Sequence, residues 1–267
     1  MEWWLVKELT NNWSALAAQT AMSVVAPKRS RLRRTMVLGE AARCDLPWTR
    51  VDSIICKDLP DTASLQLRSI CADHHSCSFH ELATLAILAK WIQPTKALEI
   101  GTYDGRSALA IATNMPEQGR LWTLNLPPDY TPAEPGKPVG PDEAIAFKVE
   151  SGYRFKPFPE SSRITQIFGD STKYDWSEIR SAHGGGPFQY IFIDGGHSSE
   201  IVLSDSRHAF DLVDKNNGLV LWHDTTRFGV RPALEQLRSQ GHPISLILGT
   251  TIGVLRYKEG KAVDLPY

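Results

Sequence analysis

Residues 97–107, which read Ala-Leu-Glu-Ile-Gly-Thr-Tyr-Asp-Gly-Arg-Ser, constrain the fold more than any other stretch of the chain. The apolar residues 96–100 predict a buried strand, and the residues from Ser107 onward predict a helix. Gly101 and Gly105 lie in the turn between them, where they let the backbone approach a ligand without a Cβ in the way. Such a turn directs unpaired N–H groups at the carboxyl end of the strand, where open α/β sheets bind ligands. The stretch therefore predicts an α/β fold with a ligand site at this turn.

Strand and helix patterns alternate along the rest of the chain. Further strands are predicted at 119–125, 163–168, 190–194 and 218–222, helices at 79–92, 141–148, 200–214 and 230–240, and a closing hairpin at 243–257. Ser78 and Glu81 have the spacing of a capping box at the start of the helix 79–92. Alternating strands and helices indicate a parallel sheet, and the hairpin adds a reversed strand.

The composition excludes several classes of protein. The chain has 267 residues, of which 42% are hydrophobic and 22% charged, and its net charge is −1. This balance gives no electrostatic reason to expect a nucleic-acid partner. No apolar run approaches the ~20 residues that span a bilayer, and the first residues lack the apolar core of a secretory signal. Four cysteines in a chain of this length are not a disulfide scaffold. We therefore expect a cytoplasmic protein with reduced thiols and no membrane partner, and leave a homo-oligomer open.

The first part of the chain, residues 1–78, is predicted to be a helical extension to a main domain at 79–267, because its early tryptophans and leucines have helical spacing. The basic stretch 28–34 is interpreted as a solvated arm. Four residues nearby are spaced like zinc ligands: Cys71, His74, Cys77 and His80. The helix that begins at Ser78 would splay such ligands apart. We therefore expect this segment to form a junction between helices beside the site entrance, and not a zinc site.

Prolines interrupt the chain after the strand 119–125. The six of them are Pro127, Pro128, Pro132, Pro135, Pro138 and Pro141. A segment so rich in proline forms neither strand nor regular helix and is long for a plain connection. We therefore interpret residues 127–160 as a lid-like insertion that faces the substrate.

The turn after the first strand is Gly-x-x-x-Gly, and Glu99 stands at the strand end. An acid there disfavours a pyrophosphate and suits the ammonium group of S-adenosylmethionine. Glu-Ile-Gly-Thr-x-x-Gly-x-Ser resembles the first motif of class I S-adenosylmethionine-dependent methyltransferases, in the form of the catechol-type O-methyltransferases; later motifs resemble the macrocin-type sugar enzymes. The resemblance covers about residues 79–258. It implies a doubly wound, Rossmann-like sheet of seven mostly parallel strands with the last antiparallel.

The resemblance also implies a cofactor site. Asn125 stands where the family has an acid for the ribose hydroxyls, and its amide can pair with them without charge assistance. Asp170 follows the strand 163–168 in a Gly-Asp-Ser turn that the family places near the adenine amino group, although an Asp there also caps helices. The predicted cofactor residues are Glu99, Gly101, Thr102, Tyr103, Gly105, Ser107, Asn125, Asp170, Ser171 and Asp194.

Two acid–histidine pairs follow neighbouring strands, Asp194 with His197 and His223 with Asp224. Methyl transfer to a hydroxyl needs its proton removed, by a histidine base or with the help of a metal. Asp194 and Asp224 resemble the metal-binding acids of the family, and His197 resembles the base of the sugar enzymes. We predict Asp194, His223 and Asp224 as ligands of Mg²⁺ or Mn²⁺, and His197, Asp194 and His223 as catalytic residues. In the metal-free alternative, His197 or His223 is the base and the carboxylates orient it.

These motifs predict an S-adenosylmethionine-dependent O-methyltransferase that acts on a sugar or phenolic hydroxyl of a small molecule. An NAD-dependent oxidoreductase would carry a three-glycine fingerprint, which this turn lacks. Asp-Gly-Gly-His after the strand 190–194 differs from the Pro-Pro-Tyr/Phe type of motif common in N-methylating families. A metal-independent enzyme of the same fold and a non-catalytic cofactor-binding protein remain the alternatives.

Overall fold

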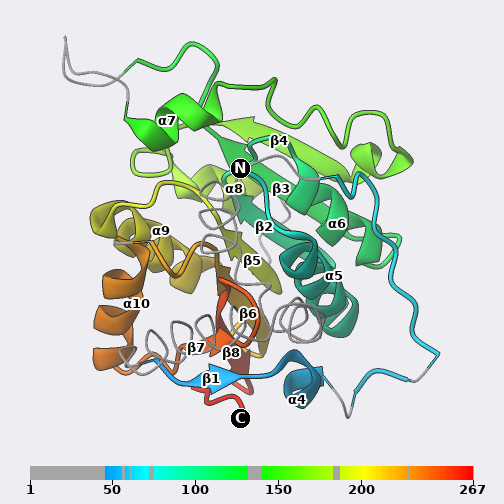
Figure 1. Cartoon of the computed structure of the whole chain (residues 1–267), viewed down its shortest axis with the longest axis vertical. Helices are drawn as coiled ribbons and strands as arrows, with labels where there is room; N and C mark the ends of the chain where they lie inside the picture. The colour runs from blue at the N-terminus through cyan, green and yellow to red at the C-terminus, as the bar shows by residue number, and fades with distance from the viewer. Residues whose placement is uncertain are drawn as a thin grey trace, which may run out of the picture.

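The chain forms one sheet between two layers of helices (Figure 1). The computed structural model describes residues 46–55, 58–60, 62–71, 75–131, 140–182, 187–227 and 229–266. The strands are β1 (Trp48–Thr49), β2 (Lys96–Ile100), β3 (Arg120–Asn125), β4 (Ile164–Phe168), β5 (Tyr190–Ile193), β6 (Asn217–Trp222), β7 (Ser245–Ile247), β8 (Gly253–Lys258) and β9 (Lys261–Val263). The helices are α4 (Val51–Ile55), α5 (Phe79–Ile92), α6 (Arg106–Asn114), α7 (Pro141–Ala146), α8 (Trp176–Ala182), α9 (Ser199–Leu212) and α10 (Val230–Ser239), with a 3-10 helix η1 (Pro159–Arg163).

The strand order places β2 at the centre of the sheet. The order is β1-β7-β8-β6-β5-β2-β3-β4, with β9 paired to β8. β2 runs parallel to both β3 and β5, and β8 runs antiparallel to β6 and β7. The carboxyl ends of β2, β3, β5 and β6 therefore meet at one edge, on either side of the point where the strand order reverses. This confirms the predicted doubly wound, mostly parallel sheet.

The sheet has nine strands, so the expected count of seven was wrong by two short strands. β1 adds to the edge strand β7 in parallel, and the Leu246 N–H donates to the Pro47 carbonyl at 2.8 Å. β9 returns along β8 after Glu259 and Gly260, which both have positive φ. A two-residue turn of this kind suits a tight hairpin. With two and three residues, these strands are too short to show an alternating pattern.

The segment before α5 contributes to the sheet as well as to the helices. The prediction of a helical extension over 1–78 falls largely outside the described residues, as does the basic stretch 28–34. In the part that is described, β1 joins the main sheet and α4 packs beside α5 (Figure 1). The described residues between 46 and 78 thus pack with the main domain. A separate helical extension stays a prediction for residues 1–45.

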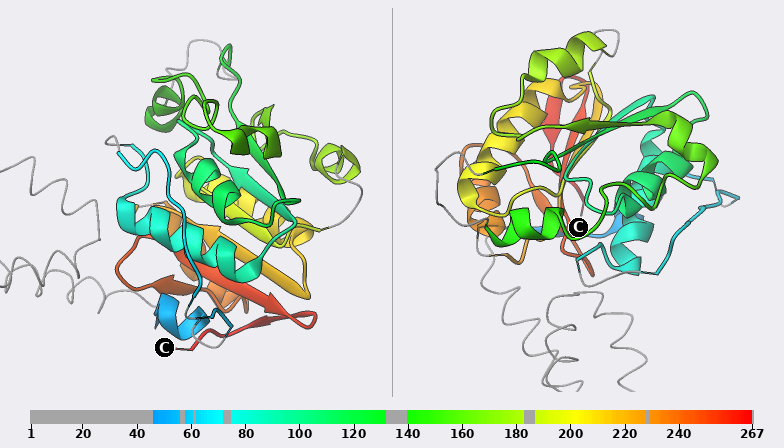
Figure 2. Two further views of the ribbon diagram at one scale, coloured as in Figure 1. Left: turned by 90° about the vertical axis from the view of Figure 1, so that its right-hand side faces the viewer. Right: turned by 90° about the horizontal axis from the view of Figure 1, so that it is seen from above.

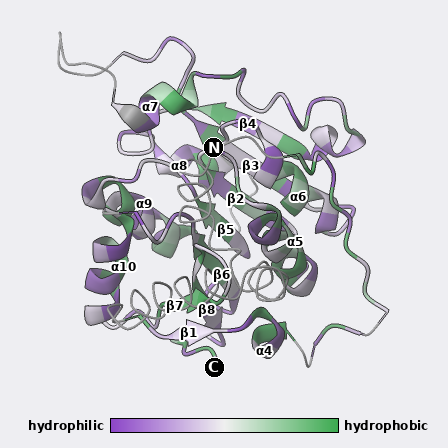
Figure 3. Cartoon of the chain, in the orientation of Figure 1, coloured by the Kyte–Doolittle hydropathy of each residue, from purple (hydrophilic) through white to green (hydrophobic). Residues whose placement is uncertain are grey.

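Helices cover both faces of the sheet, and each face has its own apolar core. Figure 2 shows α5 and α6 on one side and α8, α9 and α10 on the other. The first core includes Leu88 of α5 and Leu109 of α6; the second includes Ala209 of α9 and Leu234 of α10. Figure 3 shows hydrophobic residues on the central strands and on parts of the helices. Among the described residues, no helix has the length and apolar character needed to cross a membrane.

Candidate active site

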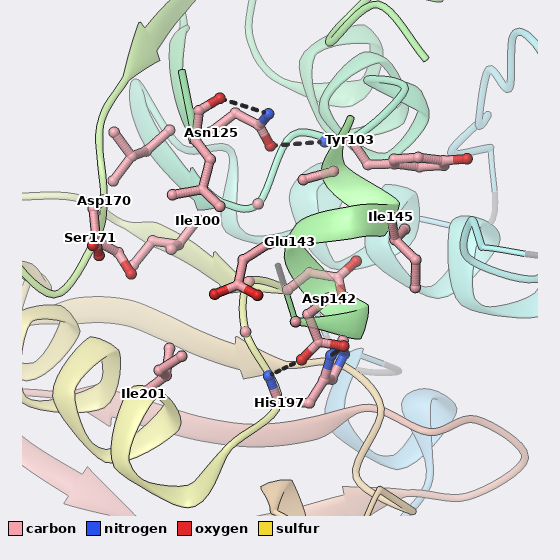
Figure 4. A pocket seen from close by; sticks show the side chains of 18 of the residues that line it. Ile100, Tyr103, Asn125, Asp142, Glu143, Ile145, Asp170, Ser171, His197 and Ile201 are labelled. Carbon is pink, nitrogen blue, oxygen red and sulfur yellow. Dashed lines mark hydrogen bonds and ion pairs between the residues drawn. The ribbon is translucent and has the colours of Figure 1, made fainter. Parts of the chain in front are cut away.

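A cavity of about 540 Å³ lies at the carboxyl edge of the parallel strands, where α7 also lines it (Figure 4). This volume is in the range of small-molecule and cofactor sites. Nine of the predicted site residues line the cavity: Gly101, Tyr103, Asn125, Asp170, Ser171, Asp194, His197, His223 and Asp224. The other four, Glu99, Thr102, Gly105 and Ser107, do not. The strand ends and the turn after β2 therefore line one cavity.

The turn after β2 presses against the end of β5. Gly101 has φ +101°, and a Cβ added there would lie 2.0 Å from the carbonyl oxygen of Asp194. The side-chain oxygen of Asn125 accepts hydrogen bonds from the backbone N–H groups of Thr102 at 3.2 Å and Tyr103 at 3.3 Å. Asn125 thus fixes the turn from the end of β3 while it also lines the cavity. Only glycine fits at position 101 without moving β5.

Glu99 lies beneath the turn rather than in the cavity. Its side chain is fully buried, and its two oxygens accept hydrogen bonds from Ser107 at 2.6 Å and Thr123 at 2.5 Å. The Thr123 hydroxyl also lies 2.6 Å from that of Thr102. Burial raises the pKa of Glu99 to about 8 despite these bonds. These bonds tie α6 to β2 and β3 through Glu99, and the direct grip on an ammonium group stays a prediction.

Asp170 and Ser171 form the cavity wall after β4. The Asp170 carboxylate accepts from the backbone N–H and hydroxyl of Thr172, at 3.0 and 2.6 Å, and pairs with Lys173 at 3.1 Å. Burial raises the pKa of Asp170, but these partners outweigh it and hold the pKa below its usual value. Asp170 both shapes its own turn and lines the cavity, and its contact with a cofactor stays a prediction.

His197 lies between two carboxylates on opposite sides of its ring. Its Nδ1 is 3.0 Å from Asp142 of α7, and its Nε2 is 3.1 Å from Asp224; both are ion-pair contacts without the alignment of hydrogen bonds. The backbone N–H of His197 donates to Asp142 at 2.9 Å (Figure 4). Burial lowers the pKa of His197, but the two carboxylates outweigh it and raise the pKa to about 9. Asp142, which carries no sequence motif, therefore joins the lid-like insertion to the site.

His223 is held from two directions at the end of β6. Its Nδ1 lies 3.0 Å from Asp194 and 3.7 Å from Asp224, and its Nε2 lies 3.3 Å from Glu81. Burial lowers the pKa of His223, but the three carboxylates reverse the direction and raise it well above its usual value. The contacts bring Asp194, His223 and Asp224 together, as predicted.

Glu81 is a site residue that the sequence showed only as a helix cap. The capping box with Ser78 is confirmed, and the other carboxylate oxygen accepts from the Thr251 N–H at 2.9 Å and hydroxyl at 2.7 Å. Burial raises the pKa of Glu81, but His223 and these donors lower it below its usual value. The residue joins α5, the loop before β8 and His223.

The donor set at the end of β5 and β6 fits a divalent ion. Carboxylate oxygen and imidazole nitrogen are common ligands of such ions, and a liganding histidine usually donates its other N–H to a carboxylate. In His223, Nε2 lies 3.3 Å from Glu81, an ion-pair contact without the alignment of a hydrogen bond, while Asp194 and Asp224 face its Nδ1. The residues present therefore suit a metal centre.

A sheet of this order, with a cavity at the carboxyl ends and acid–histidine pairs after β5 and β6, defines a Rossmann-like class of nucleoside-binding proteins. Comparison with known proteins narrows this class. Residues 98–225 match the family of methyltransferase domains. Over 164 residues the chain is 29% identical to caffeoyl-CoA O-methyltransferase 3 of Nicotiana tabacum, covering 60% of each chain. It is 39% identical over 91 residues to catechol O-methyltransferase domain-containing protein 1 of Mus musculus, covering 34% of this chain and 33% of that one.

A solved structure shares the fold. The O-methyltransferase of Bacillus cereus, in complex with SAH, has a TM-score of 0.50 at 17% identity and matches 91% of this chain and 97% of its own. These comparisons support a class I S-adenosylmethionine-dependent O-methyltransferase, and the solved structure supports the fold. The chain spans about 60% of the length of the caffeoyl-CoA relatives described above.

Proposed function

We propose that this protein transfers a methyl group from S-adenosylmethionine to a hydroxyl group of a small molecule, with the assistance of a divalent ion and a histidine base. The proposal rests on one cavity that is lined both by residues expected to bind the cofactor and by the acid–histidine pairs. Asp170 and Ser171 after β4 lie at one part of it, and His197, His223 and Asp224 lie at another. A nucleoside and a reacting hydroxyl can therefore share one enclosed space, in which positioning alone can lower the barrier by several kcal/mol, up to about 7–11 in favourable cases.

The cofactor would lie along the turn after β2, with its adenine toward Asp170 and Ser171 and its ribose toward Asn125. Gly101 and Tyr103 line this path. Because Glu99, Thr102, Gly105 and Ser107 are outside the cavity wall, their contribution is to hold the turn in shape. The amino-acid part of the cofactor would then meet backbone groups of the turn and Asp194.

Asp194 and His223 would hold the divalent ion, with Asp224 as the third expected ligand. A bound ion of this kind lowers the pKa of a hydroxyl group and orients its oxygen. As a ligand of the ion, His223 would not be free to accept a proton from the acceptor hydroxyl. His197 lies in the cavity wall beside the lid helix α7, and we assign it the base role. Its raised pKa means that it holds a proton below about pH 9, so it would act as a base only after losing that proton, which release of the contact with Asp142 or Asp224 favours.

The relatives favour a phenolic acceptor over a sugar. Their names describe O-methyltransferases for caffeoyl-CoA and a catechol O-methyltransferase domain, and both substrates are phenols. A sugar hydroxyl remains the second candidate, on the resemblance of Asp194 and His197 to the sugar enzymes.

The test is transfer of radiolabelled methyl from S-adenosylmethionine to catechol, caffeoyl and sugar acceptors, with and without a chelator. We expect labelled product that the chelator abolishes and that added divalent ions restore. Full activity in the chelator would select the metal-independent alternative. Cofactor binding without transfer to any of these acceptors would favour a non-catalytic protein.

A further inference from the structure

We propose that Cys77, Asp194 and His223 form a site for a thiophilic divalent ion such as Zn²⁺, with Cys77 in the place expected for Asp224. The inference rests on the metal-assisted function proposed above and names the ligands and ion class of that site. Among the described residues, one group of side chains brings three metal-binding atoms within 4.8 Å of one another, and it consists of these three residues. They come from three separate segments of the chain, which meet only in the folded structure.

Cys77 is buried beside Asp194, and its backbone is held by Arg106 and by the start of α5. Its side chain is 3% exposed, and its Sγ lies 4.0 Å from Asp194 Oδ2. The buried guanidinium of Arg106 donates to the Cys77 carbonyl at 2.5 Å, and Ser78 begins α5 immediately after it. Atoms bound to one ion through bonds of about 2.0–2.3 Å lie roughly 3–4 Å apart. The separation between sulfur and carboxylate is therefore that of two ligands of one ion.

The described members of the spaced Cys/His motif do not lie together in the structure. Cys71 is exposed, as is His80, whereas Cys77 turns toward Asp194. Among the described residues, its ligand partners come from the ends of β5 and β6; His74 of the spaced motif lies outside the described residues. No sequence spacing can indicate such a site.

His223 presents one nitrogen to the site. Glu81 lies 3.3 Å from Nε2 and is itself fixed by Ser78 and Thr251. Nδ1 lies 3.0 Å from Asp194 Oδ1. Glu81 therefore acts as a positioning residue that orients the imidazole toward the Asp194 side.

Asp224 is engaged elsewhere. Its Oδ2 lies 3.1 Å from His197 Nε2 and 3.1 Å from Arg227 Nε. Its other oxygen stands 3.7 Å from His223 Nδ1, farther than the Asp194 oxygen. The two acids thus have different roles: Asp194 is a ligand of the ion, and Asp224 pairs with His197.

This ligand set selects the ion and leaves room for an acceptor. Thiolate and imidazole favour Zn²⁺ and similar ions over Mg²⁺. Three protein ligands with an open fourth position are typical of catalytic zinc sites, and Asp194 and His223 both line the cavity, so the open position faces it. Binding releases the thiol proton of Cys77 to solvent.

The test is a titration of metal-stripped protein with Co²⁺, followed by the near-ultraviolet absorption that a cobalt–thiolate bond produces. The variants are Cys77→Ser, the matched control Cys71→Ser, and Asp224→Asn. We expect the band in the unmodified protein, in Cys71→Ser and in Asp224→Asn. We expect it to be lost in Cys77→Ser, with Co²⁺ affinity lowered by about tenfold or more. As a measurement without variants, X-ray absorption of the Zn²⁺-loaded protein should show a sulfur neighbour at about 2.3 Å.

Three results would overturn the inference: a band that persists in Cys77→Ser, a bound ion with no thiolate band, or a zinc shell without sulfur. Each of these leaves a metal-assisted enzyme intact. Failure of the unmodified protein to bind Co²⁺ or Zn²⁺ at all would overturn both the inference and the metal part of the proposed function. Calorimetry with S-adenosylhomocysteine on the same sample reports separately whether the cofactor part stands.

Discussion

Glu81 Oε2 lies 3.3 Å from His223 Nε2, so the residue that caps α5 also fixes the imidazole at the end of β6. A change at Glu81 therefore affects the helix start and the site together. We expect Glu81→Gln to lower metal affinity by about 10–100-fold, the usual effect of removing a carboxylate behind a liganding histidine. The variant should keep its fold, because Gln also serves in capping boxes. Calorimetric metal titration with a thermal melt checks both; an unchanged metal affinity would remove Glu81 from the site.

The free energy of unfolding of the metal-free protein should depend on pH through the titration of His197. Its folded pKa of about 9 exceeds the ordinary value of 6.5, so its contribution is complete below pH 6.5 and is lost as the pH rises through about 9. The loss is on the order of 1–3 kcal/mol. Glu99, with its pKa raised to about 8, adds to the decline in the same direction.

Asp142→Asn separates the contribution of His197 from that of Glu99. The variant should show a shallower loss of unfolding free energy between pH 6.5 and 9, measured by urea denaturation at several pH values. Glu150→Gln, which changes an exposed pair with Lys156, is the matched control and should follow the unmodified protein. Equal slopes for all three proteins would mean that Asp142 does not raise the pKa of His197.

Turnover should depend on His197 far more than cofactor binding does. We expect His197→Ala to lower kcat by about 10²–10⁴-fold, the usual contribution of a general base, while the Kd for S-adenosylhomocysteine changes little. Steady-state kinetics and calorimetry measure the two quantities. An unaltered kcat would exclude His197 from proton transfer.

Two substitutions at Glu99 distinguish a role in supporting the turn from direct contact with the cofactor. Because it is buried and bonded to Ser107 and Thr123, Glu99→Gln should keep cofactor affinity within a few fold. Glu99→Ala leaves both hydroxyls without this partner and should cost about 1–3 kcal/mol of unfolding free energy. A large loss of affinity in Glu99→Gln without loss of stability would instead favour a direct grip on the ammonium group.

The sequence predicted the sheet well because its strands are continuous apolar runs separated by helical patterns. Strands β2 to β6 begin and end within one residue of their predicted limits, and the capping box set the start of α5. Prediction of which residues line the cavity succeeded where residues directly follow a strand, as Asp194 and His223 do. The carboxyl ends of neighbouring parallel strands must meet.

The remaining parts depend on contacts through space. Cys77 and Asp142 reach the site from segments without strand patterns, and the Cys/His spacing that includes Cys77 indicates different partners for it. Glu99 was placed at the ligand by its position near the turn, but the alternation of side chains along a strand directs it toward α6, while Ile100 faces the cavity. The short strand β1 joins the sheet through two residues.

The central claim is that the cavity beside Gly101 binds the methyl donor, and calorimetry with S-adenosylhomocysteine and NAD tests it most directly. We expect binding of S-adenosylhomocysteine and none of NAD. Gly101→Ala should abolish the binding, because its Cβ would meet the Asp194 carbonyl. Tight binding of NAD, with none of S-adenosylmethionine or S-adenosylhomocysteine, would contradict the account.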